Sequence, residues 1–170
     1  MNAEKIISNV ISGSDLSEDE TFQIINAIFE GKISEEKIIS FLQALSEKGE
    51  SVEEIVGAVK SMRKHSIKVN TNLKDLVDCC GTGGLGKNIM NISTCSAFVA
   101  AAGGVKIAKH GNRTSTGVSG SADILEAAGV NISIDSEQVS KCLESVGIGF
   151  MFAQNHHPVS YTHLTLPTRS

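Results

Sequence analysis

The stretch Leu76-Val77-Asp78-Cys79-Cys80-Gly81-Thr82-Gly83-Gly84 decides the fold of this chain. Its first five residues form a short, mostly apolar segment, and a glycine-rich run follows directly. This pattern is typical of a buried strand that leads into a turn. Glycines in such a turn let backbone N–H groups close around phosphate oxygens. Taken alone, the motif fits a plain strand-to-helix turn equally well.

Downstream of this motif, helix-like and strand-like segments alternate. We expect helices over residues 93–102, 122–128 and 136–146, and strands over residues 105–108 and 148–152. Such alternation predicts a parallel sheet covered by helices, so the fold class is α/β.

The first 66 residues have a different, helical character. Helices are predicted to begin after Ser17, Ser34 and Ser51, and Gly31 and Gly49 are predicted to end the first two. The serines at 17 and 51 are followed three residues later by glutamate, which is the pattern of a capping box. The apolar residues of these helices are expected to form a core: Phe22, Ile25, Ile28, Phe29, Ile38, Phe41, Leu42, Leu45, Ile55, Val59 and Met62.

A polar stretch at residues 68–72 separates the helical segment from the α/β segment. We therefore predict a helical domain over residues 1–67 and an α/β domain over residues 72–158.

Composition narrows the classes of function. The 170 residues carry a net charge of −4, with scattered basic residues, which argues against a nucleic-acid partner. No apolar stretch approaches the roughly 20 residues that span a bilayer, and the first residues do not resemble a signal peptide. The four cysteines lack metal-ligand spacing, so we expect reduced thiols and a cytoplasmic protein.

Two further motifs favour an anionic ligand. Asn91-Ile92-Ser93-Thr94 is predicted at a helix N-terminus, where free N–H groups attract an anion, although these residues also suit simple capping. Lys109-His110-Gly111-Asn112-Arg113 follows a predicted strand and leads into a run rich in Gly, Ser and Thr. Ligands of open α/β sheets bind at such strand ends, so a phosphate site is a better explanation than a solvated turn. We interpret Asp123 as a helix cap rather than a reacting group.

In this order and spacing, the segments VDCCGTGG, NIST, AKHGNR and GSADILEAAGVNI resemble the anthranilate phosphoribosyltransferase family over residues 1–158. The resemblance implies a small helical domain, used for homodimerisation, beside an incomplete parallel-sheet domain of the nucleoside phosphorylase/phosphoribosyltransferase type. It implies transfer of phosphoribosyl from 5-phosphoribosyl 1-diphosphate (PRPP) to anthranilate, in tryptophan biosynthesis, with Mg²⁺. This chemistry requires charge neutralisation and alignment rather than a strong base, so no residue is assigned as catalytic.

The resemblance also assigns roles by position. Anthranilate is assigned to Gly81 and Asn112, and Mg²⁺ to the Ser93 hydroxyl. The residues assigned to PRPP are Gly81, Gly84, Leu85, Ile89, Asn91, Ile92, Ser93, Thr94, Lys109, His110, Gly111, Asn112, Arg113, Thr114, Ser115, Thr116, Gly117 and Ser121. His110 is expected to be a wall residue.

The chain departs from the family pattern at three places. The family usually has Asp where this chain has Leu85, and Thr where it has Ile89, so two polar contacts to PRPP are missing. Residues 159–170 have no helical period and resemble a foreign tail, with Pro167 where the family has an Arg that binds anthranilate. We expect a truncated chain without transferase activity of its own.

Two alternative functions remain from the sequence. A pyrimidine-nucleoside phosphorylase would share the helical domain and the Gly-rich turn, but its second loop lacks the HGNR sequence. A non-catalytic relative that binds nucleic acid would have a basic surface and eroded phosphate motifs, and only Leu85 and Ile89 favour it.

Overall fold

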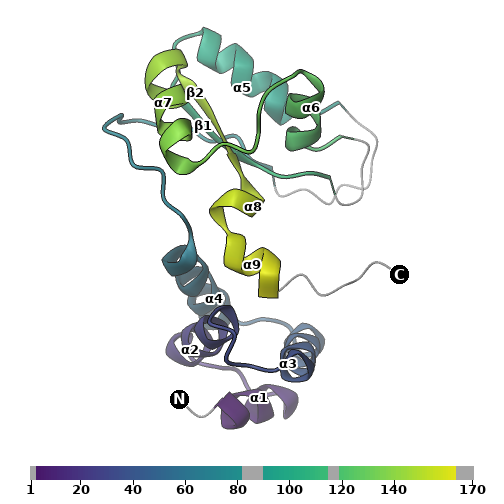
Figure 1. Ribbon diagram of the computed structural model, residues 1–170. Helices are drawn as coiled ribbons and strands as arrows, with labels where there is room; N and C mark the ends of the chain where they lie inside the picture. Colours follow the sequence, from purple (N-terminus) through teal and green to yellow (C-terminus); the bar gives the residue numbers. More distant parts are fainter. Residues whose placement is uncertain (1–2, 82–89, 115–118, 164–170) are drawn as a thin grey trace. The chain divides into compact units, whose positions relative to one another are not determined.

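A computed structural model describes residues 3–81, 90–114 and 119–163, with the backbone alone for residues 161–163. The chain divides into two compact units, one of residues 1–66 with 159–170 and the other of Ile67–Pro158 (Figure 1). Each unit is described here by itself. No described helix is long and apolar enough to cross a membrane.

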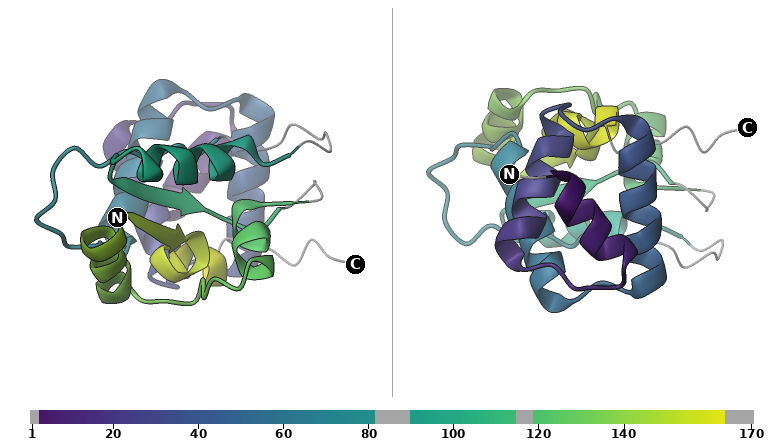
Figure 2. Two further views of the ribbon diagram at one scale, coloured as in Figure 1. Left: turned by 90° about the horizontal axis from the view of Figure 1, so that it is seen from above. Right: turned by 90° about the horizontal axis from the view of Figure 1, so that it is seen from below.

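The first unit is a helical bundle. It contains α1 (Ala3–Ile11), α2 (Glu18–Phe29), α3 (Glu35–Lys48) and α4 (Val52–His65), and α1 contacts both α2 and α3 (Figure 2, right). The predicted capping boxes are confirmed, because the Ser17 and Ser51 hydroxyls accept the N–H groups of Glu20 and Glu54. Gly49 ends α3 with a positive φ of 84°, a conformation that glycine adopts without strain.

The core of the bundle lies between α1, α2 and α3. Ile28 and Phe41 are fully buried, as their helical spacing predicts, and so is Ile24, which was not among the predicted core residues. Val159 of α9 (Pro158–His163) packs against this core. The expectation that residues 159–170 lack helical structure is therefore wrong for the described part, because proline is well suited to the first position of a helix.

The apolar residues of α4 do not lie in the core as the sequence predicts. Ile55, Val59 and Met62 were expected in the core, but they are 52%, 45% and 36% exposed. The face of α4 that packs on α2 carries small or polar residues instead, because the two helices lie so close that a Cβ added at Gly57 would overlap the carbonyl oxygen of Glu18. Helical spacing of apolar residues thus located a helix face but not the face that is buried.

The second unit is built on a parallel sheet. Strands β1 (Ile107–Gly111) and β2 (Ile148–Phe152) pair in parallel, with Ile107 opposite Ile148. The predicted strand over 76–80 contributes only one bridge, from Val77 to Ile107. Its ladder stops there because the side chain of Asp78, rather than a backbone carbonyl, accepts the N–H of His110 at 3.2 Å.

Four helices accompany the sheet: α5 (Ile92–Ala102), α6 (Ser121–Ala127), α7 (Ser136–Val146) and α8 (Ala153–His156). Helix α5 lies alongside β1 and α7 alongside β2 (Figure 2, left). The predictions for 136–146 and 148–152 are confirmed, and α5 and α6 begin one residue earlier than predicted. The helical bundle followed by an α/β unit confirms the predicted fold class.

Strand β1 differs from its prediction of 105–108, because it runs on to Gly111. Burial alternates along the whole of this strand, as is typical of a β-strand, and the buried positions are Ile107, Lys109 and Gly111. Lys109 and His110 therefore lie within the strand rather than in a loop after it, and this places the lysine inside the unit.

Candidate functional site

The candidate site lies around the carboxyl end of β1 and the N-termini of α5 and α6, all in the second unit. Six of the residues expected there lie outside the described residues: Gly84, Leu85, Ile89, Ser115, Thr116 and Gly117. The remaining ones are found on three elements that the fold brings together. These are the entry to α5, the strand β1 with the residues after it, and the start of α6.

Asn91 organises the entry to α5. Its Oδ1 accepts the N–H of Thr94 at 3.0 Å and the hydroxyl of Ser93 at 2.9 Å, so it is the N-cap of the helix. The Thr94 hydroxyl is buried and has no hydrogen-bond partner among the described residues. Since a buried polar atom without a partner costs free energy, this hydroxyl marks a place where a polar ligand would be stabilised.

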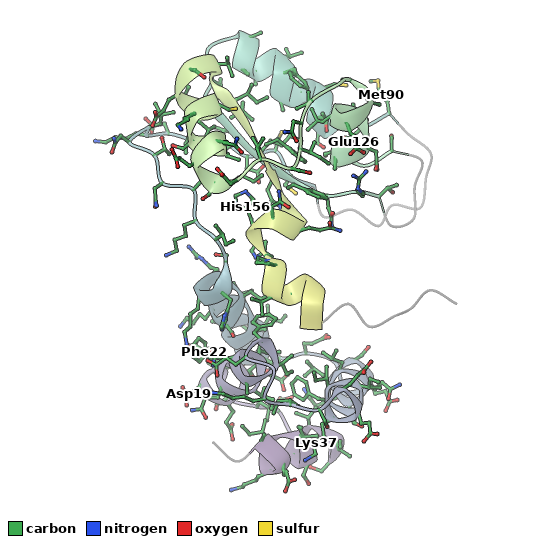
Figure 3. The ribbon with its side chains drawn as sticks, viewed as in Figure 1. Asp19, Phe22, Lys37, Met90, Glu126 and His156 are labelled. Atoms are coloured by element: carbon green, nitrogen blue, oxygen red, sulfur yellow. The ribbon has the colours of Figure 1, made fainter. Side chains whose placement is uncertain are left out.

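The same asparagine connects α5 with α6. Its Nδ2 lies 3.4 Å from the carbonyl oxygen of Ser119 and 3.5 Å from the hydroxyl of Ser121, which is the first residue of α6. Four of the residues assigned to PRPP, namely Asn91, Ser93, Thr94 and Ser121, thus lie together around the N-terminus of an 11-residue helix. That end of a helix carries unpaired N–H groups and attracts anions. Met90, which is exposed, precedes it (Figure 3).

Lys109 brings a positive charge to this group. The residue is only 2% exposed, and the described residues offer its Nζ one polar partner, the Cys79 sulfur at 3.9 Å. Cys79 in turn donates to the carbonyl oxygen of Ser93 at 3.1 Å. Within the described parts of the chain this buried ammonium group has no anionic partner to offset its desolvation, so the site favours an anion.

Two residues of this arrangement, Asp78 and Cys79, were not predicted from the sequence. Asp78 fixes the backbone of His110, and Cys79 contacts both Lys109 and the α5 N-terminus. Their position was the available signal, because they end the predicted strand that leads into the Gly-rich turn. Burial and the nearby Asp78 carboxylate raise the pKa of the adjacent Cys80 thiol, which keeps that residue protonated at neutral pH.

His110 forms a wall with two other histidines. Its ring meets that of His157 edge to face, with 5.6 Å between centroids, and its Nε2 is buried without a partner among the described residues. Burial lowers the pKa of both imidazoles, so both are neutral at pH 7. His156 of α8, labelled in Figure 3, anchors the wall by its backbone carbonyl, which accepts the N–H of Ile67 at 2.8 Å.

Arg113 points toward α6 rather than toward the α5 N-terminus. Its guanidinium donates to both carboxylate oxygens of Glu126 at 2.7 and 3.0 Å, and to Asp123 at 3.3 Å. These two carboxylates raise the pKa of Arg113 still further above its ordinary value. Asn112 and Thr114 flank it, and the carbonyl of Asn112 accepts the N–H of Ala122 at 3.2 Å.

Gly111 and Gly81 differ in what surrounds them. A Cβ at Gly111 would lie 2.8 Å from the Phe150 ring and 2.9 Å from the Cβ of Ser121, so this glycine allows β1 to pass close to α6. A Cβ at Gly81 would meet nothing within 4 Å. Gly111 is therefore needed for packing, whereas the described surroundings of Gly81 impose no such requirement.

The chain is similar in sequence and fold to known proteins. Residues 4–66 match a family model described as the helical bundle domain of a glycosyl transferase family, and residues 73–170 match its a/b domain. An anthranilate phosphoribosyltransferase of Acetivibrio thermocellus is 52% identical over 154 residues, which are 91% of this chain and 45% of that protein.

Two solved structures are similar throughout the chain. The crystal structure of anthranilate phosphoribosyltransferase from Thermus thermophilus has a TM-score of 0.86 at 40% identity, over 97% of this chain and 49% of that one. The enzyme from Saccharomyces cerevisiae, in complex with PRPP and Mg, has a TM-score of 0.85 at 28% identity, over 96% of this chain and 49% of that one. The chain thus spans about half the length of these relatives.

Proposed function

This chain belongs to the glycosyl transferase family of helical bundle and a/b domains, with the anthranilate phosphoribosyltransferases among its members, and from that we propose that it binds PRPP for transfer of phosphoribosyl to anthranilate. The observation that carries the proposal is the buried Lys109 beside the N-terminus of α5. The two alternatives from the sequence are not supported, because the relatives and structures above are all phosphoribosyltransferases. The associated pathway, tryptophan biosynthesis, and a cytoplasmic location are part of the proposal.

The described residues can supply binding and charge neutralisation. The ammonium group of Lys109 and the N–H groups at the start of α5 would hold the diphosphate, and they would stabilise its charge as the bond to ribose breaks. The neutral wall of His110 and His157 would exclude water from the acceptor side. The anthranilate amine is already nucleophilic, so the residues need to align it rather than remove its proton before attack.

Mg²⁺ fits the donors at the α5 N-terminus. The Ser93 hydroxyl uses its hydrogen to bond Asn91 at 2.9 Å, which leaves oxygen lone pairs for a metal. A single hydroxyl suits Mg²⁺, because this ion keeps several water and phosphate ligands in phosphate-binding sites. When bound with PRPP, the ion would neutralise charge on the diphosphate leaving group.

Calorimetric titration of the 170-residue chain tests the proposed function. We expect PRPP with Mg²⁺ to bind, inorganic diphosphate to compete, and ribose 5-phosphate to bind more weakly because it lacks the diphosphate. A DNA duplex should give no heat, since the net charge is −4. Binding of DNA without binding of PRPP would refute the proposal and favour the nucleic-acid-binding alternative.

We further propose that the helical unit mediates homodimerisation. The exposed apolar residues of α4, Val52, Ile55 and Val59, support this proposal because such a stripe on a helix favours contact with a partner surface. Sedimentation equilibrium should show a dimer, and Ile55→Glu with Val59→Glu should convert it to a monomer. The control is Val99→Glu, which places one carboxylate on an exposed apolar residue of α5. A monomeric wild type, or a dimer that only the control disrupts, would contradict the proposal.

A further inference from the structure

The sulfur atom of Cys79 contacts both of the groups that are proposed to hold the diphosphate. It lies 3.9 Å from the ammonium nitrogen of Lys109 and 3.1 Å from the carbonyl oxygen of Ser93, in the first turn of α5. These two neighbours come from different elements, because Lys109 belongs to β1. One side chain thus connects the buried cation with the helix end of the candidate site.

The chemistry of the two neighbours determines the direction of the thiol hydrogen. An ammonium group has only donors, and a carbonyl oxygen has only lone pairs. The thiol therefore donates its single hydrogen to Ser93 and presents its lone pairs to Lys109. Because the hydrogen points away from the lysine, the negative end of the S–H dipole faces the ammonium group. Cys79 is oriented as an acceptor for this cation.

The contact restricts the position of the ammonium group. A lysine side chain is long and flexible and loses much rotamer freedom when it is ordered. Lys109 is 2% exposed, and Cys79 supplies the one polar partner of its Nζ among the described residues. An ammonium group has three donors, so one can stay on the sulfur while phosphate oxygens accept the others. A cation that is ordered before the ligand arrives binds that ligand more tightly, because less freedom is lost on binding.

The N-terminus of α5 is held by contacts that do not involve the thiol. The Asn91 side chain caps the helix at the N–H of Thr94 and lies 3.5 Å from the hydroxyl of Ser121 in α6. Replacement of Cys79 would leave these contacts in place. The loss of the thiol should therefore release the lysine and not the helix end.

We propose that Cys79 is a positioning residue for the phosphate ligand, and that its sulfur holds the Lys109 ammonium beside the N-terminus of α5 before the ligand binds. The inference rests on the proposed binding of PRPP and adds a residue that the resemblance does not assign to this ligand. The alternative is that Cys79 only fills space as a small, half-buried apolar residue, as free cysteines commonly do.

Cys79→Val and Cys79→Ser separate the two roles. Valine is apolar and of similar size but has no donor or acceptor, whereas serine keeps both and is smaller. PRPP with Mg²⁺ is titrated calorimetrically into the 170-residue chain. Kd should rise about fivefold in Cys79→Val and stay within about twofold of the wild type in Cys79→Ser. A role in packing alone predicts the reverse order. The matched control is Cys142→Val, at a half-buried cysteine of α7 in the same unit, which should leave Kd unchanged.

Two further measurements show whether Cys79 acts through Lys109. In the Lys109→Met background, Cys79→Val should change Kd by less than about twofold, because no ammonium group is left to position. The second measurement needs no ligand. The proton–nitrogen NMR signal of the Lys109 ammonium group, assigned by its absence in Lys109→Met, should exchange its hydrogens with water faster in Cys79→Val. In Cys79→Ser the exchange rate should stay close to that of the wild type.

The outcomes separate the inference from the proposed function. If the wild type does not bind PRPP, the proposed function fails, and the positioning role for this ligand fails with it. If the wild type binds, an unchanged Kd in Cys79→Val would overturn the inference alone. An equal loss of affinity from Cys79→Val with and without the Lys109 ammonium would also overturn it, because the cysteine would then act through α5. Parallel changes of Kd and ammonium exchange in Cys79→Val, both restored in Cys79→Ser, support the inference.

Discussion

Replacement of Lys109 by methionine is expected to weaken the binding of PRPP about 10- to 100-fold without lowering the Tm of the protein. A hydrogen bond to a charged group contributes about 1.5–3 kcal/mol, and about 1.4 kcal/mol corresponds to a factor of ten in affinity. Lys109 is 2% exposed, so few water molecules would compete with a phosphate for its ammonium group. The large loss of affinity follows from this burial.

The expected behaviour of the Tm follows from the same burial. In the absence of a ligand, the described residues give the Lys109 ammonium only the Cys79 sulfur, at 3.9 Å. Methionine has a similar length and no charge to desolvate, so the variant loses little packing and no strong ion pair. A loss of affinity without a loss of stability is characteristic of a binding residue and not of a core residue.

Calorimetry with PRPP and Mg²⁺, together with thermal melts, checks this prediction. Lys106→Met is the matched control, because Lys106 lies beside Gly147 at the opposite end of β1 and outside the proposed site. It should leave the affinity for PRPP unchanged. An unchanged affinity in Lys109→Met, or a fall in Tm of several degrees with no change in affinity, would show that the lysine has a structural role.

The sequence predicts where the helices begin better than it predicts which face of each helix is buried. Capping boxes at Ser17 and Ser51 depend on contacts within four residues, and they were predictable because local spacing determines them. The exposure of Ile55 and Val59 was not predictable, because it results from the close approach of α2 and α4 at Gly57. A contact between distant segments leaves no signal in the period of one helix.

The candidate site shows the same division. The structure brings Asn91, Lys109 and Ser121 from the predicted motifs into one region, because the carboxyl ends of parallel strands and the following helix N-termini meet at one edge of a sheet. The sequence could not show that Arg113 turns toward Glu126, because charge alone suggests a phosphate ligand. Which anion a basic side chain binds depends on its direction, and only the folded structure shows this direction.

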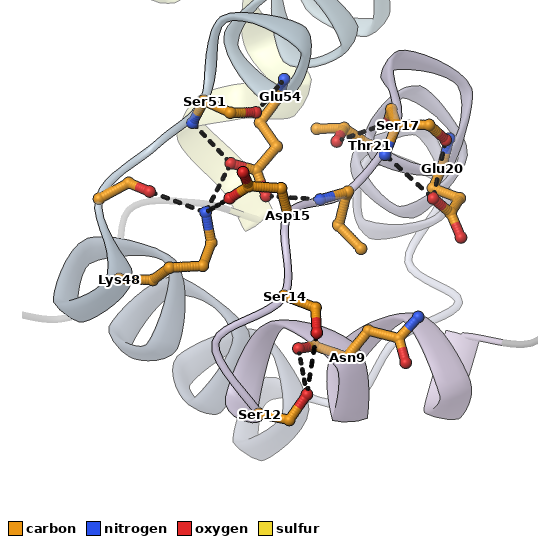
Figure 4. Close-up of polar contacts among 12 residues, drawn as sticks. Asn9, Ser12, Ser14, Asp15, Ser17, Glu20, Thr21, Lys48, Ser51 and Glu54 are labelled. Carbon is orange, nitrogen blue, oxygen red and sulfur yellow. Dashed lines mark hydrogen bonds and ion pairs between the residues drawn. The ribbon is translucent and has the colours of Figure 1, made fainter.

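In the helical unit, Glu54→Ala is expected to lower the free energy of unfolding by about 3–5 kcal/mol, the cost of breaking a buried ion pair by removing one partner. Glu54 is 1% exposed and accepts the N–H groups of Leu16 at 2.9 Å and Ser51 at 2.7 Å (Figure 4). Its carboxylate also binds the Lys48 ammonium at 2.9 Å, and Lys48 reaches Asp15 at 2.6 Å. Three donors from separate parts of the bundle would lose one acceptor.

Urea unfolding followed by circular dichroism measures this effect, because the bundle contributes much of the helical signal. The matched control is Glu53→Ala, the exposed neighbour on α4, for which a change within about 0.5 kcal/mol is expected. Similar losses in the two variants would mean that the buried carboxylate has no special role. Glu54→Gln should lose less than Glu54→Ala, because its amide oxygen still accepts one of the two N–H groups.

The contribution of Glu54 should also depend on pH in a defined direction. Burial alone would raise its pKa, but the hydrogen bonds from Ser51, Leu16 and Lys48 outweigh burial and hold the pKa below the ordinary value of 4.5. The unfolded chain therefore binds more protons than the folded one as the pH falls past that value, so acid favours unfolding. The stabilisation is fully present above the ordinary pKa and disappears as the pH falls through the lower folded pKa. The difference in unfolding free energy between the wild type and Glu54→Gln should accordingly be constant from pH 6 to 8 and shrink below about pH 4.5. A difference that grows in acid would mean that the folded protein holds Glu54 protonated.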